Sequence, residues 1–329
     1  MQLPELRYNP VLRDWTMVAS NRQTRPDMPE DRCPFCPGSG KVPDQYAVYV
    51  YDNDFPVLSP DPEAPVAPPT GLYRVAPAVG KCEVILYSSD HEASLSRLSV
   101  AHTAQVVQVW RERSIALSRH PQHQYVLIFE NRGREVGATI AHPHGQLYAL
   151  PFVPRKIRTE LDAAEAHAWA TGRCLICDVT AAELDDGRRM VAENERFVAY
   201  IPFFTDFPYG AWISPRHHVP DLARFDRPDV DDLAALLHAL TQGMDALFDK
   251  AFPYMMVLHQ LPVHRPDAES FYHFHIEFYP PLRDKDKVKF LASAETGAEA
   301  AANPATVEET AQQLRAAVER RQLLRGRWP

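Results

Sequence analysis

Apolar residues recur at helical spacing in three long stretches of this chain. In 99–119 they include Val106, Trp110 and Leu117, and the pattern ends just before His120-Pro121, as helices do before proline. A second such pattern fills 229–250, and a third, at 307–325, consists of strong helix formers. We therefore predict long helices in these three places and a surface loop in the proline-rich stretch 60–71.

Shorter runs rich in aromatic and β-branched residues predict strands. They lie at 46–51, 125–130 and 147–150 in the first part of the chain and at 197–203 and 254–259 in the second. Both parts have the same order of features: an aromatic-rich strand, Asp-Phe-Pro, a strand ending near a histidine, a helix, another strand and paired histidines. A repeated order of this kind indicates duplication of one unit. We predict an α+β fold of two homologous units, 1–155 and 156–329, each a mainly antiparallel sheet with a long helix.

The paired histidines of the first unit belong to the most specific motif of the chain, His142-Pro143-His144-Gly145-Gln146. The motif runs directly into the predicted strand at 147–150, where alternate side chains share a face, so His142, His144 and Gln146 are expected to point the same way. A neutral imidazole nitrogen can attack phosphorus without a base when a hydrogen bond at the other nitrogen fixes the tautomer. The motif therefore favours chemistry at phosphorus over a purely packed role.

Cysteine pairs suggest what one of these histidines does. Cys33 and Cys36 lie upstream, followed by His91. Two cysteines and two distant histidines form an S₂N₂ donor set suited to Zn²⁺, which assigns one histidine of the motif to metal and leaves the other free. A lone pair of cysteines could equally be packed thiols, but the pattern occurs twice, which favours metal. The second set is Cys174, Cys177, His218 and His273.

Composition narrows the classes of function. The 329 residues are 45% hydrophobic, enough for a substantial core, and no apolar run is as long as a membrane span. The net charge of -8 offers no basic field for nucleic acid, so any polyanion that binds must be small. The amino terminus lacks a signal-peptide pattern, and four of the five cysteines stand in the CxxC pairs, which suits a reducing compartment. We predict a cytoplasmic protein without membrane or nucleic-acid partners.

With several other pieces spread over nearly the whole chain, these motifs resemble the galactose-1-phosphate uridylyltransferase family, a branch of the histidine-triad superfamily built from two fused histidine-triad-like units. The pieces that carry the resemblance are Arg7 to Pro10, Arg25-Pro26, Asn53 to Pro56, Ser89 to His91, Glu130 to Gly133, His142 to Gln146 and Phe278 to Pro281. The resemblance implies a ping-pong exchange in which UDP-glucose gives its uridylyl group to a histidine, glucose 1-phosphate leaves, and galactose 1-phosphate takes the group. It also implies a homodimer whose active sites borrow residues from the partner's carboxy-terminal segment.

Individual roles follow from the resemblance by position. The residue that matches the family's nucleophile is His144, and His142 is then a metal ligand of the first set. Gln146 is a neutral amide where many related hydrolases have a third histidine; because a sugar 1-phosphate has a second pKa near about 6, it leaves without a general acid, and transfer is favoured over hydrolysis. The matches to diphosphate, nucleoside and phosphate contacts are Arg22, Arg25, Asn53, Asp54, Asn131, Gly137, Ala138 and Thr139, with Lys289 and Phe290 expected to act in the partner's site.

Departures from the family leave alternatives open. Thr139-Ile140-Ala141 stands where the best-studied members have Ser-Asn-Pro, so the preferred hexose 1-phosphate is open. The second metal could use the second cysteine set, as in relatives of the ADP-glucose phosphorylase type. The alternative set is Glu160, His259, His275 and Glu277.

The second unit also differs from the first at the motif itself. His275 stands where His144 stands, but Ile276-Glu277 replaces Gly145-Gln146. A carboxylate in that place repels a phosphoryl group, so we expect one catalytic and one degenerate unit. Other functions that fit the motifs are an adenylyl-group phosphorylase or transferase, a slow nucleotide hydrolase, and a metal-stabilised nucleotide-binding protein without turnover.

Overall fold

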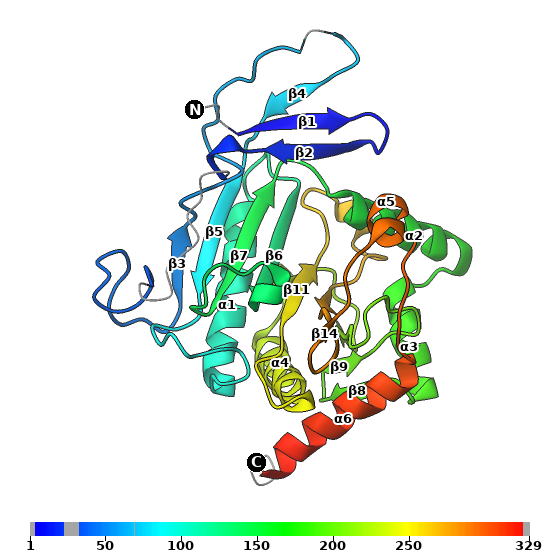
Figure 1. Ribbon diagram of the computed structural model, residues 1–329. Coiled ribbons are helices and arrows are strands. Elements are labelled where there is room, and N and C mark those ends of the chain that lie inside the picture. Colours follow the sequence, from blue (N-terminus) through cyan, green and yellow to red (C-terminus); the bar gives the residue numbers. More distant parts are fainter. Residues whose placement is uncertain (1–3, 23–32, 69, 325–329) are drawn as a thin grey trace.

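A nine-stranded antiparallel sheet forms the centre of the molecule (Figure 1). The computed structural model describes residues 4–22, 33–68 and 70–324. Within them the strand order is β3-β5-β7-β6-β11-β12-β10-β9-β8. In chain order these strands are β3 (Tyr49–Asp52), β5 (Lys81–Leu86), β6 (Tyr125–Arg132), β7 (His144–Leu150), β8 (Met190–Glu193), β9 (Phe197–Tyr200), β10 (Trp212–Pro215), β11 (Tyr254–His259) and β12 (His275–Tyr279).

Two equivalent runs of strands meet in the middle of this sheet. The order β3-β5-β7-β6 of the first half is mirrored by β11-β12-β10-β9 of the second, and the halves join where β6 pairs with β11, with Leu258 opposite Ile128. The two strands that begin at the histidine motifs, β7 and β12, therefore occupy equivalent places. The predicted α+β fold is confirmed. The division at 155/156 stays a prediction, because one sheet runs through both halves.

Two long helices lie side by side on one face of the sheet. Helix α1 (Val100–Ser118) begins at Ser99, whose side chain accepts a hydrogen bond from the His102 N–H. Helix α4 (Arg227–Leu247) begins with a capping box between Asp226 and Asp229. The main hydrophobic core lies between these helices and the sheet. Both predicted helices are confirmed, although α4 begins two residues and ends three residues earlier than its apolar pattern indicates.

The opposite face of the sheet is covered by elements that the sequence pattern does not reveal. They include α2 (Arg155–Thr171), α3 (Leu175–Asp186) and a small sheet of order β2-β1-β4 that lies above the large sheet in Figure 1. Leu6 of the small sheet and Leu161 of α2 belong to the same core cluster as Tyr148 of β7. The bounds of the small sheet are β1 (Glu5–Asn9), β2 (Asp14–Val18) and β4 (Val75–Pro77).

The predicted closing helix is α6 (Val307–Leu324), which packs against α4 and β8. Among the described residues, no helix combines the length and the apolar character that crossing a membrane requires. The remaining elements are the hairpin β13 (Leu282–Asp284) and β14 (Lys287–Val288), the helix α5 (Ser293–Ala298), and the 3-10 turns Ser20–Arg22, Arg134–Val136, Leu222–Arg224 and Pro266–Ala268.

Candidate active site and metal centres

The histidine motif lies at the point where a loop enters β7, which pairs with β5 and β6 on its two sides. His144 and Gln146 project from the same face of this strand. The Nδ1–H of His144 donates to the carbonyl oxygen of His142 at 2.8 Å. This bond fixes the tautomer in which Nε2 carries the lone pair, as a nucleophilic histidine requires. The side-chain carbonyl of Gln146 accepts a hydrogen bond from the Tyr148 hydroxyl at 3.4 Å.

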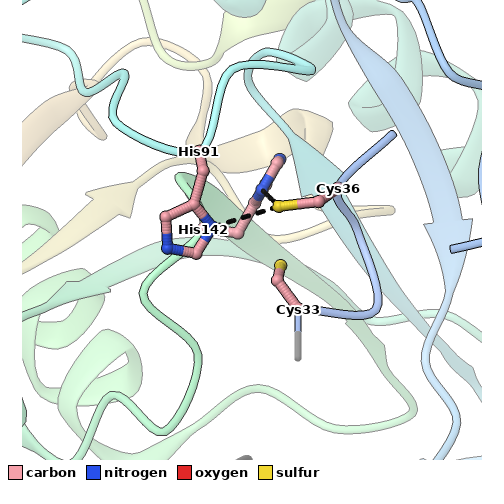
Figure 2. Close-up of side chains that lie close together, drawn as sticks. All are labelled: Cys33, Cys36, His91 and His142. Carbon is pink, nitrogen blue, oxygen red and sulfur yellow. Dashed lines mark hydrogen bonds between the residues drawn. The ribbon is translucent and has the colours of Figure 1, made fainter. Parts of the chain in front are cut away.

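Four side chains from distant parts of the chain converge beside the motif (Figure 2). Cys33, Cys36, His91 and His142 each offer one donor atom, and these atoms lie within 4.8 Å of one another. The Cys36 Sγ lies 3.3 Å from His91 Nδ1 and 3.8 Å from His142 Nδ1. A tetrahedral zinc with bond lengths of about 2.0–2.3 Å separates its donors by about 3.3–3.8 Å. The residues of the first set therefore fit a zinc ion.

Further contacts hold His142 in the orientation that a ligand needs. Its Nε2–H donates to the Ser88 carbonyl oxygen at 2.7 Å, and the Tyr46 hydroxyl lies 3.0 Å from the same nitrogen. Burial lowers the pKa of His142 to about 4, so the ring is neutral near pH 7 and Nδ1 can bind a metal. Burial and the neighbouring Cys33 raise the pKa of the Cys36 thiol to about 11, so its thiolate form requires a bound cation.

A cavity of about 480 Å³ lies beside His144. Its walls include Asn131 at the end of β6, the loop residues Ala138 and Thr139, and both histidines of the motif. Gly137, next to this loop, has a φ of 79°, in the left-handed region that favours glycine. The structure therefore brings the predicted nucleophile together with the predicted contacts to the transferred phosphate, in a pocket of the size that small-molecule ligands use.

Asn53 and Asp54 follow the end of β3 and are held by local hydrogen bonds rather than lining this cavity. Asn53 Oδ1 accepts from the Phe55 N–H at 2.9 Å. Asp54 accepts from the Tyr51 hydroxyl at 2.6 Å and from Lys41 Nζ at 2.5 Å. Because Lys41 follows Cys36 closely in the chain, one segment contacts both the first metal set and the predicted nucleoside contact.

Lys289 and Phe290 lie at a different cavity from that of His144. Lys289 is buried in its own chain, where its ammonium group donates to the Asp206 carbonyl oxygen and lies over the Phe207 ring. Phe290 is 79% exposed. Within one chain, neither is brought to the motif. Arg22 is half-buried at the end of a 3-10 turn, and Arg25 lies outside the described residues.

The second cysteine set is also assembled. Its donor atoms, from Cys174, Cys177, His218 and His273, lie within 4.8 Å of one another. The Cys177 Sγ lies 3.2 Å from His273 Nδ1 and 3.7 Å from His218 Nδ1, again the spacing of a tetrahedral site. Interaction with the Cys177 thiol lowers the pKa of Cys174, which favours the thiolate form that a metal ion binds. The set ties the amino end of α3 to the start of β12.

The alternative second metal set, Glu160, His259, His275 and Glu277, forms a separate cluster whose donor atoms also lie within 4.8 Å of one another. His273 belongs to the cysteine set and His275 to this one, so the two sets do not compete for a histidine. A cation already stands beside this cluster, because Lys156 Nζ donates to Glu277 Oε2 and to the Tyr279 hydroxyl, each at 2.6 Å.

Several side chains that shape these sites are not among the site residues that the sequence predicts. Lys156 and Tyr279 reach the carboxylate cluster, and Ser88 and Tyr46 orient His142. Their roles depend on contacts across the sheet, which spacing along the chain does not reveal. Two of them carry a signal. Lys156 precedes Glu160 by four residues and shares its helical face, and Tyr279 belongs to the 278–281 motif.

Two family models cover almost all of the chain. The first is described as the N-terminal domain of galactose-1-phosphate uridyl transferase and matches residues 1–154. The second is described as the C-terminal domain of the same enzyme and matches residues 160–323.

Individual relatives agree with these models. A galactose-1-phosphate uridylyltransferase of Thermotoga maritima is 41% identical over 94% of this chain and 98% of the relative. One of Haemophilus influenzae is 32% identical over 95% of this chain and 94% of the relative. A solved uridylyltransferase structure matches with a TM-score of 0.88 at 32% identity and covers 96% of this chain and 99% of its own. An ADP-glucose phosphorylase from Arabidopsis thaliana, with bound ADP-glucose, matches with a TM-score of 0.73 at 25% identity, over 95% of this chain and 98% of its own.

Proposed function

The chain belongs to the galactose-1-phosphate uridylyltransferase family, whose members are nucleotidyltransferases, and from this premise we propose that it moves a uridylyl group from UDP-glucose to galactose 1-phosphate through a covalent intermediate on His144. The observation that supports this histidine above all is the hydrogen bond from its Nδ1–H to the His142 carbonyl oxygen at 2.8 Å. It leaves Nε2 as a neutral nucleophile beside the cavity that Asn131 and Thr139 line.

The exchange has two steps, and each step forms one bond and breaks one. In the first, His144 Nε2 attacks the α-phosphorus of UDP-glucose, the N–P bond forms, and the P–O bond to glucose 1-phosphate breaks. In the second, a phosphate oxygen of galactose 1-phosphate attacks the same phosphorus, and the electron pair of the N–P bond returns to Nε2. No proton moves at His144, because Nδ1–H stays on the His142 carbonyl throughout. The neutral amide of Gln146 donates to the phosphoryl oxygens without repelling them.

We also propose that zinc occupies both cysteine sets. In the first, Cys33, Cys36, His91 and His142 would hold it, and in the second, Cys174, Cys177, His218 and His273. With four protein ligands each, such ions supply cross-links rather than an open position for substrate. The first set positions the backbone of His142, whose carbonyl orients the nucleophile.

Adenylyl transfer is the second candidate function. It is favoured by the second cysteine set and by the likeness to an ADP-glucose phosphorylase at 25% identity. Intact-protein mass spectrometry after mixing with UDP-glucose, and separately with ADP-glucose, distinguishes the two. We expect a uridylyl adduct that maps to His144 and is discharged by galactose 1-phosphate. An adduct from ADP-glucose alone would favour adenylyl transfer, and no adduct from either would favour a binding protein without turnover.

We propose in addition a cytoplasmic homodimer. The free thiol state of all five cysteines suits a reducing compartment, and exposed Phe290 beside buried Lys289 supports a role for this segment at a partner's active site. Sedimentation of the protein tests the dimer, and the Phe290→Ala variant tests the shared active site. The substitution should raise the KM for UDP-glucose more than it changes the unfolding temperature, and an unchanged KM would argue against a shared site.

A further inference from the structure

A buried polar group that the exchange described above does not use lies behind the strand of the nucleophile. Glu130 of β6 is 5% exposed, and the Tyr254 hydroxyl donates to its Oε1 at 3.0 Å. Its Oε2, the Tyr87 hydroxyl and Trp110 Nε1 are buried and have no hydrogen-bond partner within the described parts of the chain. Buried polar atoms without partners are rare and costly, so three in one place need an explanation.

These three atoms lie near one another. The Tyr87 and Trp110 rings meet edge to face, with centroids 6.0 Å apart. Burial raises the pKa of the Tyr87 hydroxyl well above its usual range, and the nearby Glu130 carboxylate raises it further. A chain of hydrogen bonds from Trp110 Nε1–H to the Tyr87 oxygen, and from the Tyr87 O–H to Glu130 Oε2, would satisfy all three atoms.

Tyr87 touches the histidine motif twice. Its backbone N–H donates to the Pro143 carbonyl oxygen at 3.0 Å. Its hydroxyl lies so close to Gly145 that a Cβ added there would stand 2.3 Å from it. Gly145 does not have a positive φ, so glycine is needed here for space rather than for conformation. The hydroxyl thus supports, from the face opposite His144, the backbone that joins His144 to Gln146.

The second half of the molecule lacks this polar group. Ile85 lies opposite Gly145 as Ile213 lies opposite Ile276, and Phe129 lies opposite Gln146 as Val257 lies opposite Glu277. By this register the counterparts of Tyr87, Glu130 and Gly145 are Pro215, Leu258 and Ile276, all without a polar side chain. Of the two halves, the one with His-Gly-Gln therefore has the buried hydroxyl and carboxyl, and the other has apolar side chains at the equivalent positions.

We propose that Tyr87, oriented by Glu130, is a positioning residue for the nucleophile: its hydroxyl supports the Gly145 peptide and so aims His144 Nε2 and the Gln146 amide at phosphorus. This inference rests on the proposed transfer through His144. Because a small misalignment of reacting atoms slows the chemical step without weakening ground-state binding, the effect belongs in kcat and not in KM.

Single-turnover formation of the uridylyl adduct, followed by quenched flow and intact-protein mass, tests the proposal. Tyr87→Phe should slow adduct formation on the order of tenfold with the KM for UDP-glucose unchanged. The matched control is Tyr125→Phe, which also removes a fully buried hydroxyl, one that accepts the Gln260 N–H at 3.3 Å; Tyr125 pairs with Leu150, at the far end of β7 from Gly145. It should keep the wild-type rate.

A pair of variants tests the contact itself. Gly145→Ala would place a Cβ 2.3 Å from the Tyr87 oxygen, and removal of that oxygen leaves the nearest atom at 3.1 Å. Gly145→Ala combined with Tyr87→Phe should therefore form the adduct faster than Gly145→Ala alone. A wild-type rate in Tyr87→Phe, or a double variant no faster than Gly145→Ala, would overturn the inference. An absence of adduct on the wild-type protein would instead overturn transfer through His144.

Discussion

His144 and His275 begin equivalent strands, and each donates its Nδ1–H to the carbonyl two residues earlier, at 2.8 and 3.1 Å. Their surroundings differ. His144 is half-buried beside a cavity, whereas His275 is 1% exposed and stacks on Trp212 with ring centroids 4.7 Å apart. Its Nε2 lies 3.3 Å from the Glu277 carboxylate. The orientation of the imidazole is thus a property of the fold, while access to its second nitrogen depends on the neighbouring side chains.

The change from Gly145-Gln146 to Ile276-Glu277 accounts for much of this difference. Burial opposes a charge on His275, yet the hydrogen bond to Glu277 and the nearby Glu160 raise its pKa. The Glu277 carboxylate beside Nε2 therefore favours a proton on that nitrogen over the lone pair that a nucleophile needs. In the proposed function the first half binds and reacts, whereas the second half uses the same geometry to hold charged side chains together.

The largest effect is expected from removing each histidine in turn. His144→Ala should lower exchange between UDP-glucose and galactose 1-phosphate on the order of 10⁴-fold or more, because the covalent intermediate cannot form. His275→Ala should leave a readily measurable rate and lower the unfolding temperature, since it empties a packed ion-pair cluster. A coupled assay for product and a thermal melt measure both. Loss of exchange in His275→Ala with activity retained in His144→Ala would reverse the assignment of the halves.

Exchanging Gln146 and Glu277 for each other's side chain tests whether this position causes the difference between the two halves. Gln146→Glu gives the first half the carboxylate of the second, which should repel the phosphoryl group and lower kcat on the order of 10²- to 10³-fold. Glu277→Gln makes the reverse change and is the matched control. It should leave kcat nearly unchanged, although it weakens the contacts to Lys156 and His275. Steady-state kinetics at fixed pH measure kcat for both variants. An active Gln146→Glu enzyme would mean that Gln146 does not face the phosphate.

The sequence predicts well those features that depend on local spacing. Helices α1 and α4, the motif strand and both cysteine sets follow from periodicity and from repeated order, because each uses residues whose chemistry is specific. Helix α2 has few apolar positions, with Ile157, Leu161 and Ala164 as its buried residues, so its pattern is weak. The strands of the small sheet, at three to five residues each, are too short for alternation to stand out.

Contacts across the sheet could not be predicted. Glu130 is part of a motif that carries the family resemblance, yet its neighbours come from elsewhere in the sheet, Tyr87 from just after β5 and Tyr254 from β11, and register is set only once the sheet forms. The separation of His273 and His275 into different clusters has the same cause. The chain alone leaves both cysteine and carboxylate sets open, and the fold assembles each of them.

Metal content should separate the two cysteine sets. Cys174→Ser should lose one zinc per chain and on the order of 2 kcal/mol or more of unfolding free energy while exchange continues, because this set lies away from the motif. Cys33→Ser should lose one zinc and much of kcat as well, since the orientation of His142 depends on the first set. Elemental analysis and urea unfolding of the two proteins provide the measurement. Equal kinetic effects would show that the second set also supports the catalytic half.

A purely pH-dependent effect on stability is expected from Glu130, whose counterpart in the second half is Leu258. Burial raises the pKa of Glu130 from 4.5 to about 7, against the opposing influence of Arg132 and of the Tyr254 and Tyr87 hydroxyls. The folded protein then binds this proton more tightly than the unfolded chain, so the stabilising contribution is complete below about pH 4.5 and is lost as the pH rises through about 7. The loss is on the order of 3 kcal/mol.

Glu130→Gln removes this titration and keeps a polar side chain of the same size. The free energy of unfolding of the variant, relative to the wild type, should therefore increase between pH 5 and pH 8, as measured by urea unfolding at each pH. Other titrating groups are shared by the two proteins and cancel in the difference. A difference that stays constant over this range would mean that Glu130 is ionised throughout, its charge stabilised by Arg132 and the two hydroxyls. Glu130 would then carry a charge, as the ion-paired carboxylates of the second half do, although its counterpart in that half is the apolar Leu258.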